Sequence, residues 1–146
     1  MCDISIIITN YNKGFLLERA VRSALGQILI RKTHEVIVVD DASSDGSLDG
    51  ISDLFDSLKV IKHDTNLGVS AASNTGISAS SGRYWVRVDA DDFLSQMALQ
   101  YMSAILDENP EISIVSADHL VISQLGTSVE RVSLASNEAL VKHGAG

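Results

Sequence analysis

The sequence predicts an α/β domain with a mainly parallel sheet. Short runs of β-branched and aromatic residues alternate with segments whose apolar residues recur at helical spacing. The first run, 4–9, is almost entirely apolar, as expected for a strand buried on both faces. Polar residues gather directly after four such runs, and in open α/β sheets ligands bind outside the carboxyl ends of the strands. We therefore expect any site at this edge.

The first two thirds of the chain hold four expected strands, at 4–9, 35–40, 60–63 and 84–88. Between the strands, apolar spacing predicts helices at 17–25 and 48–58, the first of which ends at Gly26. A third helix follows 66–68, and its body of small residues, including Ala72, Gly76 and Ala79, permits close approach to the sheet or to a ligand.

The last third is expected to begin with a helix that Ser95 could cap and that Asn109-Pro110 ends. Its inward residues are predicted to be Ala98, Met102, Ile105 and Leu106. Two alternating runs around 124–126 predict a hairpin, and 137–142 predicts a short final helix.

Composition narrows the class of protein. The 146 residues carry a formal net charge of -8, which argues against nucleic acid because such binding depends on Lys and Arg. A single cysteine, Cys2, fits a reducing compartment, so we expect a cytoplasmic protein, with peripheral contact at the inner membrane face through other regions as a further option. No signal peptide or membrane segment is expected.

Three carboxylates stand within four residues in Asp89-Ala90-Asp91-Asp92, directly after an expected strand. Such carboxylates repel one another unless a cation lies among them, and oxygen ligands suit Mg²⁺ or Mn²⁺, which also bind phosphates. We expect one or two to bind metal, and another to reach a sugar hydroxyl or metal-bound water. The alternative is a solvated acidic turn that caps the next helix.

A second acidic pair, Asp40-Asp41, ends the second expected strand. An ionised carboxylate only accepts hydrogen bonds, so Asp41 could bind a pyrimidine N–H or ribose hydroxyls. The alternative is a turn and cap role, which we assign to 43–45. Tyr11 could stack on a base or anchor its loop.

Several other chemistries lack support. No histidine pair has metal-ligand spacing, so the four histidines are expected at surface or strand-edge positions: His34, His63, His119 and His143. There is no Gly-x-Ser-x-Gly elbow, no Walker loop and no Gly-x-Gly-x-x-Gly after the first strand. Hydrolase, ATPase and dinucleotide-binding functions are therefore not indicated.

Four stretches together resemble the inverting family-2 glycosyltransferases. They are Ser5–Asn12 with Leu25–Gln27, Val38–Ser47, Asn66–Gly76, and Asp89–Asp92. The resemblance covers roughly 4 to 107. It implies a Rossmann-like three-layer α/β/α fold of the GT-A (nucleotide-diphospho-sugar transferase) type with a mainly parallel sheet.

The resemblance also implies a nucleotide-diphosphosugar donor, most often a UDP-sugar, bound with Mn²⁺ or Mg²⁺. The metal stabilises the leaving diphosphate while an acceptor hydroxyl attacks from the opposite face, helped by a carboxylate base. The acceptor would be a saccharide, lipid-linked or protein hydroxyl. The implied donor contacts are Thr9, Tyr11, Asn12, Asp41, Asn66, Asp89 and Asp91, and the implied metal ligands are Asp91 and Asp92.

Two departures from the family pattern matter. Ser73 stands where many relatives carry Arg, and no Glu-Asp pair follows the expected hairpin, so no catalytic base is assigned and neither Asp118 nor Glu130 is chosen. We therefore expect 1–146 to be a single donor-binding domain, incomplete for turnover, with a nucleotide-binding core at 1–107 and the start of an acceptor-side half at 108–146.

Two other hypotheses come from different classes. One is a sugar-nucleotide-binding module without turnover, since the base is missing. The other is a receiver-like phosphotransfer domain, because acidic strand ends also hold Mg²⁺. That domain would need a phospho-accepting Asp after the third strand and a Lys after a later one; Asp64 could at most supply the first.

Overall fold

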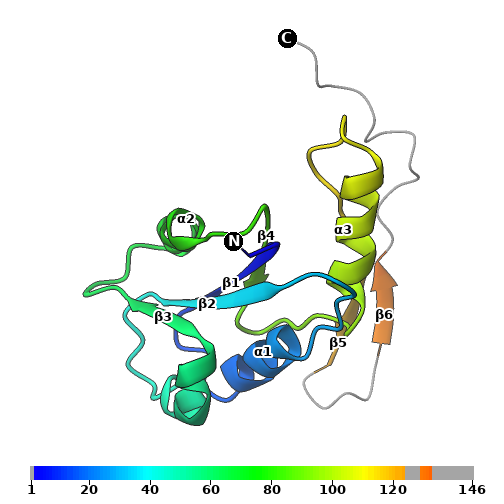
Figure 1. Ribbon diagram of the computed structural model, residues 1–146. Coiled ribbons are helices and arrows are strands. Elements are labelled where there is room, and N and C mark those ends of the chain that lie inside the picture. Colours follow the sequence, from blue (N-terminus) through cyan, green and yellow to red (C-terminus); the bar gives the residue numbers. More distant parts are fainter. Residues whose placement is uncertain (1, 124–128, 133–146) are drawn as a thin grey trace. The chain divides into compact units, whose positions relative to one another are not determined.

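The computed structural model describes residues 2–123 and 129–132. The chain divides into two compact units, Met1–Gln100 and Tyr101–Gly146. Figure 1 labels the elements, which are β1 (Ile4–Asn10), α1 (Leu16–Leu25), β2 (His34–Asp40), the 3₁₀ helix η1 (Asp49–Ser57), β3 (Lys59–Lys62), α2 (Val69–Ala79), β4 (Tyr84–Asp89), α3 (Ala98–Glu108), β5 (His119–Ile122) and β6 (Val129–Val132).

The first unit contains a four-stranded sheet of order β3-β2-β1-β4 in which every pairing is parallel. The predicted mainly parallel sheet is thus confirmed. The strands end in register, because Thr9 pairs with both Val39 and Asp89 and Asp40 pairs with Lys62. Their carboxyl ends therefore lie along one edge.

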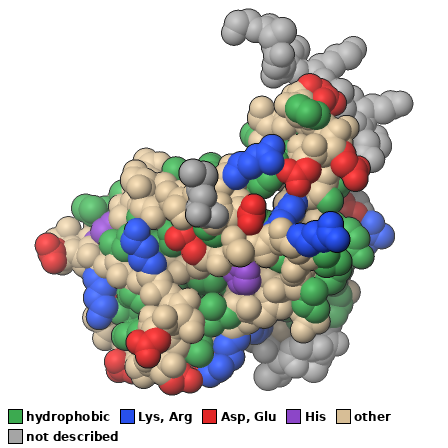
Figure 2. Space-filling view, in the orientation of Figure 1, with side chains coloured by type: hydrophobic (Ala, Val, Ile, Leu, Met, Phe, Trp, Pro, Cys, Tyr) green, Lys and Arg blue, Asp and Glu red, His purple; other side chains and the backbone are tan. Residues whose placement is uncertain are grey.

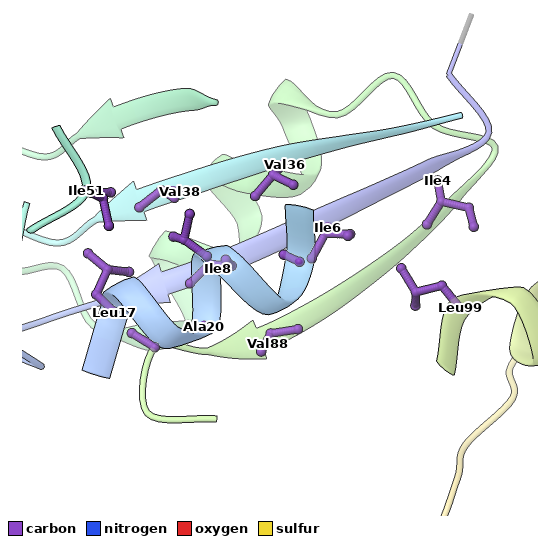
Figure 3. Close-up of a cluster of buried hydrophobic side chains, with 13 residues drawn as sticks. Ile4, Ile6, Ile8, Leu17, Ala20, Val36, Val38, Ile51, Val88 and Leu99 are labelled. Carbon is purple, nitrogen blue, oxygen red and sulfur yellow. The ribbon is translucent and has the colours of Figure 1, made fainter. Parts of the chain in front are cut away.

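Helices cover both faces of this sheet, with α1 and α2 on opposite sides (Figure 1). Alternate residues of β1 contribute to the hydrophobic clusters on the two faces of the sheet. Ile6 and Ile8 pack with Leu17 of α1 and Ile51 of η1 in the larger cluster (Figure 3), whereas Ile7 packs with Ala72 of α2 in the smaller one. This is the α/β/α layering that the family resemblance implied.

The small residues of α2 do bring this helix close to the sheet, as predicted. A Cβ added at Gly76 would lie 2.3 Å from Ile7 Cγ2 and 3.3 Å from Val39 Cγ2. Gly68, which precedes α2, has φ +87°, a conformation that favours glycine. The helix can therefore begin at a sharp turn.

Some expected details differ. The segment expected as an amphipathic α-helix at 48–58 is the 3₁₀ helix η1, with bonds such as Ile51 N–H to Leu48 O. Gly50 weakens an α-helix, and Ser52 Oγ donates to the Asp49 carbonyl at 2.9 Å, so local bonds compete with the α-helical pattern.

In α3, Ile105 is exposed rather than inward, because Leu99 and Ser103 occupy the buried stripe of this helix. The helix begins three residues after Ser95, whose carbonyl accepts the Ala98 N–H at 3.1 Å. The expected turn at 124–126 and the expected helix at 137–142 lie outside the described residues.

The second unit contains the antiparallel pair β5–β6, as the predicted hairpin requires. Asp118 forms an ion pair with Arg131 of β6.

No helix in the described part of the chain is long and apolar enough to cross a membrane. On the face that Figure 2 shows, Lys and Arg side chains are scattered among Asp and Glu, so the coloured residues form no continuous basic surface there.

Candidate functional site

A cavity of about 390 Å³ opens at the carboxyl edge of the sheet. Loops after β1, β2, β3 and β4 and the start of α2 form its wall. Its lining residues are Thr9, Asn10, Tyr11, Lys13, Asp41, Asn66, Gly68, Val69, Ala72, Asp89, Ala90 and Asp91. The structure therefore brings together six of the predicted donor-binding residues: Thr9, Tyr11, Asp41, Asn66, Asp89 and Asp91.

Backbone hydrogen bonds continue past the strand ends and hold these loops in register. Asp41 N–H donates to the Asn10 carbonyl at 2.8 Å, and His63 N–H donates to the Asp40 carbonyl at 2.9 Å. On the other side of β1, Ala90 N–H donates to the Thr9 carbonyl at 3.1 Å. The loops that follow these four strands therefore all start at the same edge of the sheet, although they are distant in sequence.

Asp41 is the most enclosed carboxylate of the cavity, at 3% exposure. Its Oδ1 accepts from Leu67 N–H at 2.9 Å and its Oδ2 from Gly68 N–H at 2.7 Å. Nδ1 of His63 lies 2.7 Å from Oδ1. Burial alone would raise the pKa of Asp41, but the bonds from Leu67, His63 and Gly68 hold this pKa below its usual value.

The neighbouring Asp40 points to the other face of the sheet and is also buried. It accepts from the side-chain amide of Asn10 at 2.7 Å and from Ser43 N–H at 3.2 Å. The same amide donates to Ser47 Oγ at 2.9 Å. Asp40 therefore shapes the following loop, whereas Asp41 faces the cavity.

Asp89 and Asp91 form the acidic side of the cavity, and each contacts a cation. Arg87 lies 2.9 Å from Asp89, and Lys13 Nζ lies 2.7 Å from Asp91 Oδ2. Thr9 Oγ1 also donates to Asp89 Oδ1 at 3.2 Å. The hydrogen bond between Lys13 and Asp91 raises the pKa of Lys13 and lowers that of Asp91.

Two predicted site residues do not line the cavity. Asn12 adopts φ 51°, and its side-chain oxygen accepts from Ser44 N–H at 2.9 Å, so it ties the first loop to the second. Asp92 is exposed, and its N–H donates to the Asp89 carbonyl at 2.9 Å within the turn. Adjacent residues of a tight turn point in different directions, which is why the spacing alone did not separate Asp91 from Asp92.

The described residues contain no cluster of three or more His, Cys, Asp or Glu side chains arranged to hold a metal ion. Two carboxylates, Asp89 and Asp91, nevertheless offer oxygen atoms to the cavity. Oxygen ligands of this kind suit Mg²⁺ or Mn²⁺, which keep several waters or bind substrate phosphates. These carboxylate oxygens therefore fit a metal ion that is held jointly by the protein and a bound ligand.

Sequence reasoning missed two contributors. Lys13 lines the cavity. His63 does lie at the end of an edge strand, as one of the two expected placements had it, but its side chain is only 10% exposed and contacts Asp41. His63 directly follows β3 at the same edge as the other loops, and that position was the available clue. Lys13 carried no such clue, because its pairing with Asp91 spans 78 residues.

Similar solved structures identify the class of protein. A fragment of S. aureus TarS in complex with UDP-GlcNAc has a TM-score of 0.67 at 28% identity, covering 74% of this chain and 32% of that one. The mannosyltransferase PcManGT from Pyrobaculum calidifontis, in complex with GDP-Man and Mn²⁺, has a TM-score of 0.57 at 27% identity, covering 62% and 28%. The fold is thus of the GT-A glycosyltransferase type.

The sequence comparison agrees. The model of glycosyl transferase family 2 matches residues 5–127, so the chain belongs to this family. The succinoglycan biosynthesis protein ExoO of Rhizobium meliloti is 33% identical over 135 residues, which cover 91% of this chain and 38% of that protein. Four such relatives are covered over only 36%, 42%, 47% and 38% of their lengths, so the chain spans less than half of each.

Proposed function

We propose that this chain is the donor-binding part of an inverting glycosyltransferase that takes a UDP-sugar with Mn²⁺ or Mg²⁺. The observation that carries the proposal is the cavity itself. At one side of the cavity the buried carboxylate of Asp41 can accept a hydrogen bond from a ligand. At the other side lie the exposed carboxylates of Asp89 and Asp91. Family membership supplies the reaction class.

The nucleoside end is assigned to Asp41 and Tyr11. A carboxylate has about four acceptor positions, and three donors already occupy Asp41, so about one remains for a ligand. Uracil offers a single ring N–H, whereas guanine offers adjacent ring and amino donors. This count favours a uridine over a guanosine nucleotide. Tyr11 is 46% exposed on the cavity wall and offers a face for stacking.

The diphosphate end is assigned to Asp91 as the metal ligand that lines the cavity and to Asp89 as a donor contact. Asp92, the second metal ligand expected from the sequence, does not line the cavity and is assigned no contact with the donor. The Lys13–Asp91 pair is 41% and 42% exposed, and exposed pairs are weak, so a divalent ion can displace the lysine at little cost. When bound, the ion supplies charge that stabilises the leaving nucleotide diphosphate. Thr9 and Arg87 hold the Asp89 carboxylate in place.

The acceptor hydroxyl would attack the anomeric carbon from the face opposite the diphosphate, assisted by a carboxylate base. The two acids considered from the sequence, Asp118 and Glu130, belong to the second unit, whereas every residue that lines the cavity belongs to the first. No residue is therefore assigned as the base.

Calorimetric titration with UDP tests the proposal. Binding with Mn²⁺ should be at least about tenfold tighter than with EDTA, because the ion neutralises the diphosphate beside two carboxylates. Asp91→Asn should reduce this metal dependence. Asp56→Ala, an equal charge change on exposed η1, should leave it unchanged. UDP binding that ignores Mn²⁺, or no UDP binding by the folded chain, would overturn the donor-site assignment.

A further inference from the structure

His63 follows β3, and its imidazole lies between two other segments. Its Nδ1 is 2.7 Å from Asp41 Oδ1, in the loop after β2, and its Nε2 is 3.0 Å from Thr75 Oγ1, in α2. Both ring nitrogens thus have a polar neighbour while the side chain is only 10% exposed. A largely enclosed imidazole held at both nitrogens has one fixed orientation.

His63 does not line the cavity, but one of its two partners does. Its partner Asp41 lines the cavity and also accepts the N–H groups of Leu67 and Gly68. The Asn66–Gly68 segment in turn presents Asn66 and Gly68 to the cavity and starts α2. One imidazole is therefore connected to two separate parts of the wall through a single carboxylate.

We propose that His63 is a positioning residue of the nucleotide pocket, acting through Asp41; this rests on the proposed function. With Nδ1–H donating to Oδ1, the carboxylate cannot rotate, and its remaining acceptor position faces the cavity. Without that donor, a buried carboxylate loses one of its three partners and can turn to recover it. A nucleobase N–H then meets a misdirected acceptor, although no ligand contact of His63 itself is lost.

Two near-isosteric variants separate positioning from simple structural support. The amide nitrogen of Asn stands near Nδ1 and that of Gln near Nε2, so His63→Asn keeps a donor for Asp41 and His63→Gln keeps a partner for Thr75. Thr75→Val is the matched control, since it removes the Nε2 partner alone.

UDP titration with Mn²⁺ should show about tenfold weaker binding for His63→Gln and less than about threefold for His63→Asn and Thr75→Val. Thermal unfolding should show comparable losses for both His63 variants. If both His63 variants instead bind UDP equally weakly, in step with their equal loss of stability, the positioning role is overturned.

Amide chemical shifts of Leu67 and Gly68 in the ligand-free chain give a second readout that needs no donor. They should move in His63→Gln and stay near wild type in His63→Asn, because they report the bonds to Asp41. If wild type fails to bind UDP, the proposed function fails, and these shifts still decide whether His63 positions Asp41. Unchanged shifts in His63→Gln would contradict it.

Discussion

Two carboxylates stand at opposite ends of β2 and on the same face of the sheet. Glu35 is near the start of the strand, and Asp41 directly follows its end. Glu35 Oε1 accepts from Ser5 Oγ at 2.6 Å, Ser81 N–H at 2.7 Å and Ser81 Oγ at 2.8 Å. Asp41 likewise has three donors around it. The hydrogen bonds and the lowered pKa values of both groups look alike.

The difference lies in what surrounds them. The partners of Glu35 join β1, β2 and the turn before β4, where Gly82 N–H also donates to Ser5 Oγ at 2.9 Å. The partners of Asp41 leave one side open to the cavity. A carboxylate with three hydrogen-bond donors and a lowered pKa is therefore no sign of function by itself. The adjoining cavity is what distinguishes Asp41 from Glu35.

The largest effect, on the free energy of unfolding, is expected at Gly82, which contacts Ser5 beside Glu35. A Cβ there would lie 2.6 Å from Ser5 N and 2.7 Å from Tyr84 O, both backbone atoms that cannot easily move. We expect Gly82→Ala to lower the free energy of unfolding by about 3 kcal/mol, the upper range for overpacking, measured by urea denaturation. Gly50→Ala, with nothing within 4 Å, is the control and should change it little.

Asp41→Asn comes next. The amide keeps one acceptor oxygen but replaces the other with a donor that faces N–H groups, so about 2 kcal/mol of UDP binding should be lost. Calorimetry at constant Mn²⁺ would show this as a fall of roughly thirtyfold in affinity. Wild-type affinity in the Asn variant would show that Asp41 only shapes its loop, as Asp40 does.

Glu35→Gln should have a smaller effect, and a different one. We expect a loss of about 1 kcal/mol in unfolding free energy, because a charged acceptor is replaced by a neutral one, with UDP affinity unchanged. A drop in affinity at Glu35 would mean that the two ends of β2 are coupled, and the distinction between them would fail.

The smallest expected effect is on the loss of stability at low pH. Both carboxyl groups have folded-state pKa values below their usual values, so their contribution to stability is present above about pH 4.5 and is lost as pH falls through the folded values. Urea midpoints measured between about pH 2 and 6 should therefore decline less steeply in Glu35→Gln and Asp41→Asn than in wild type. An equal slope in all three would contradict the assigned pKa directions.

The order of strands and loops was predictable because the evidence for it is local. Apolar runs such as 4–9 identify buried strands, and parallel strands with right-handed crossovers place their carboxyl ends together. Thr9, Asp41 and Asp89 were therefore expected at one edge, and they do line one cavity. The family resemblance came from the same motifs.

The tertiary structure decided which polar side chains face that cavity. Neighbouring residues of a strand or turn point to different sides, so Asp41 opens to the cavity and Asp40 does not, and Asp91 lines it and Asp92 does not. Pairings between distant segments, such as Lys13 with Asp91 and His63 with Asp41, depend on how loops close over the sheet. Local spacing carries no record of such contacts, because they form only when the strands are side by side.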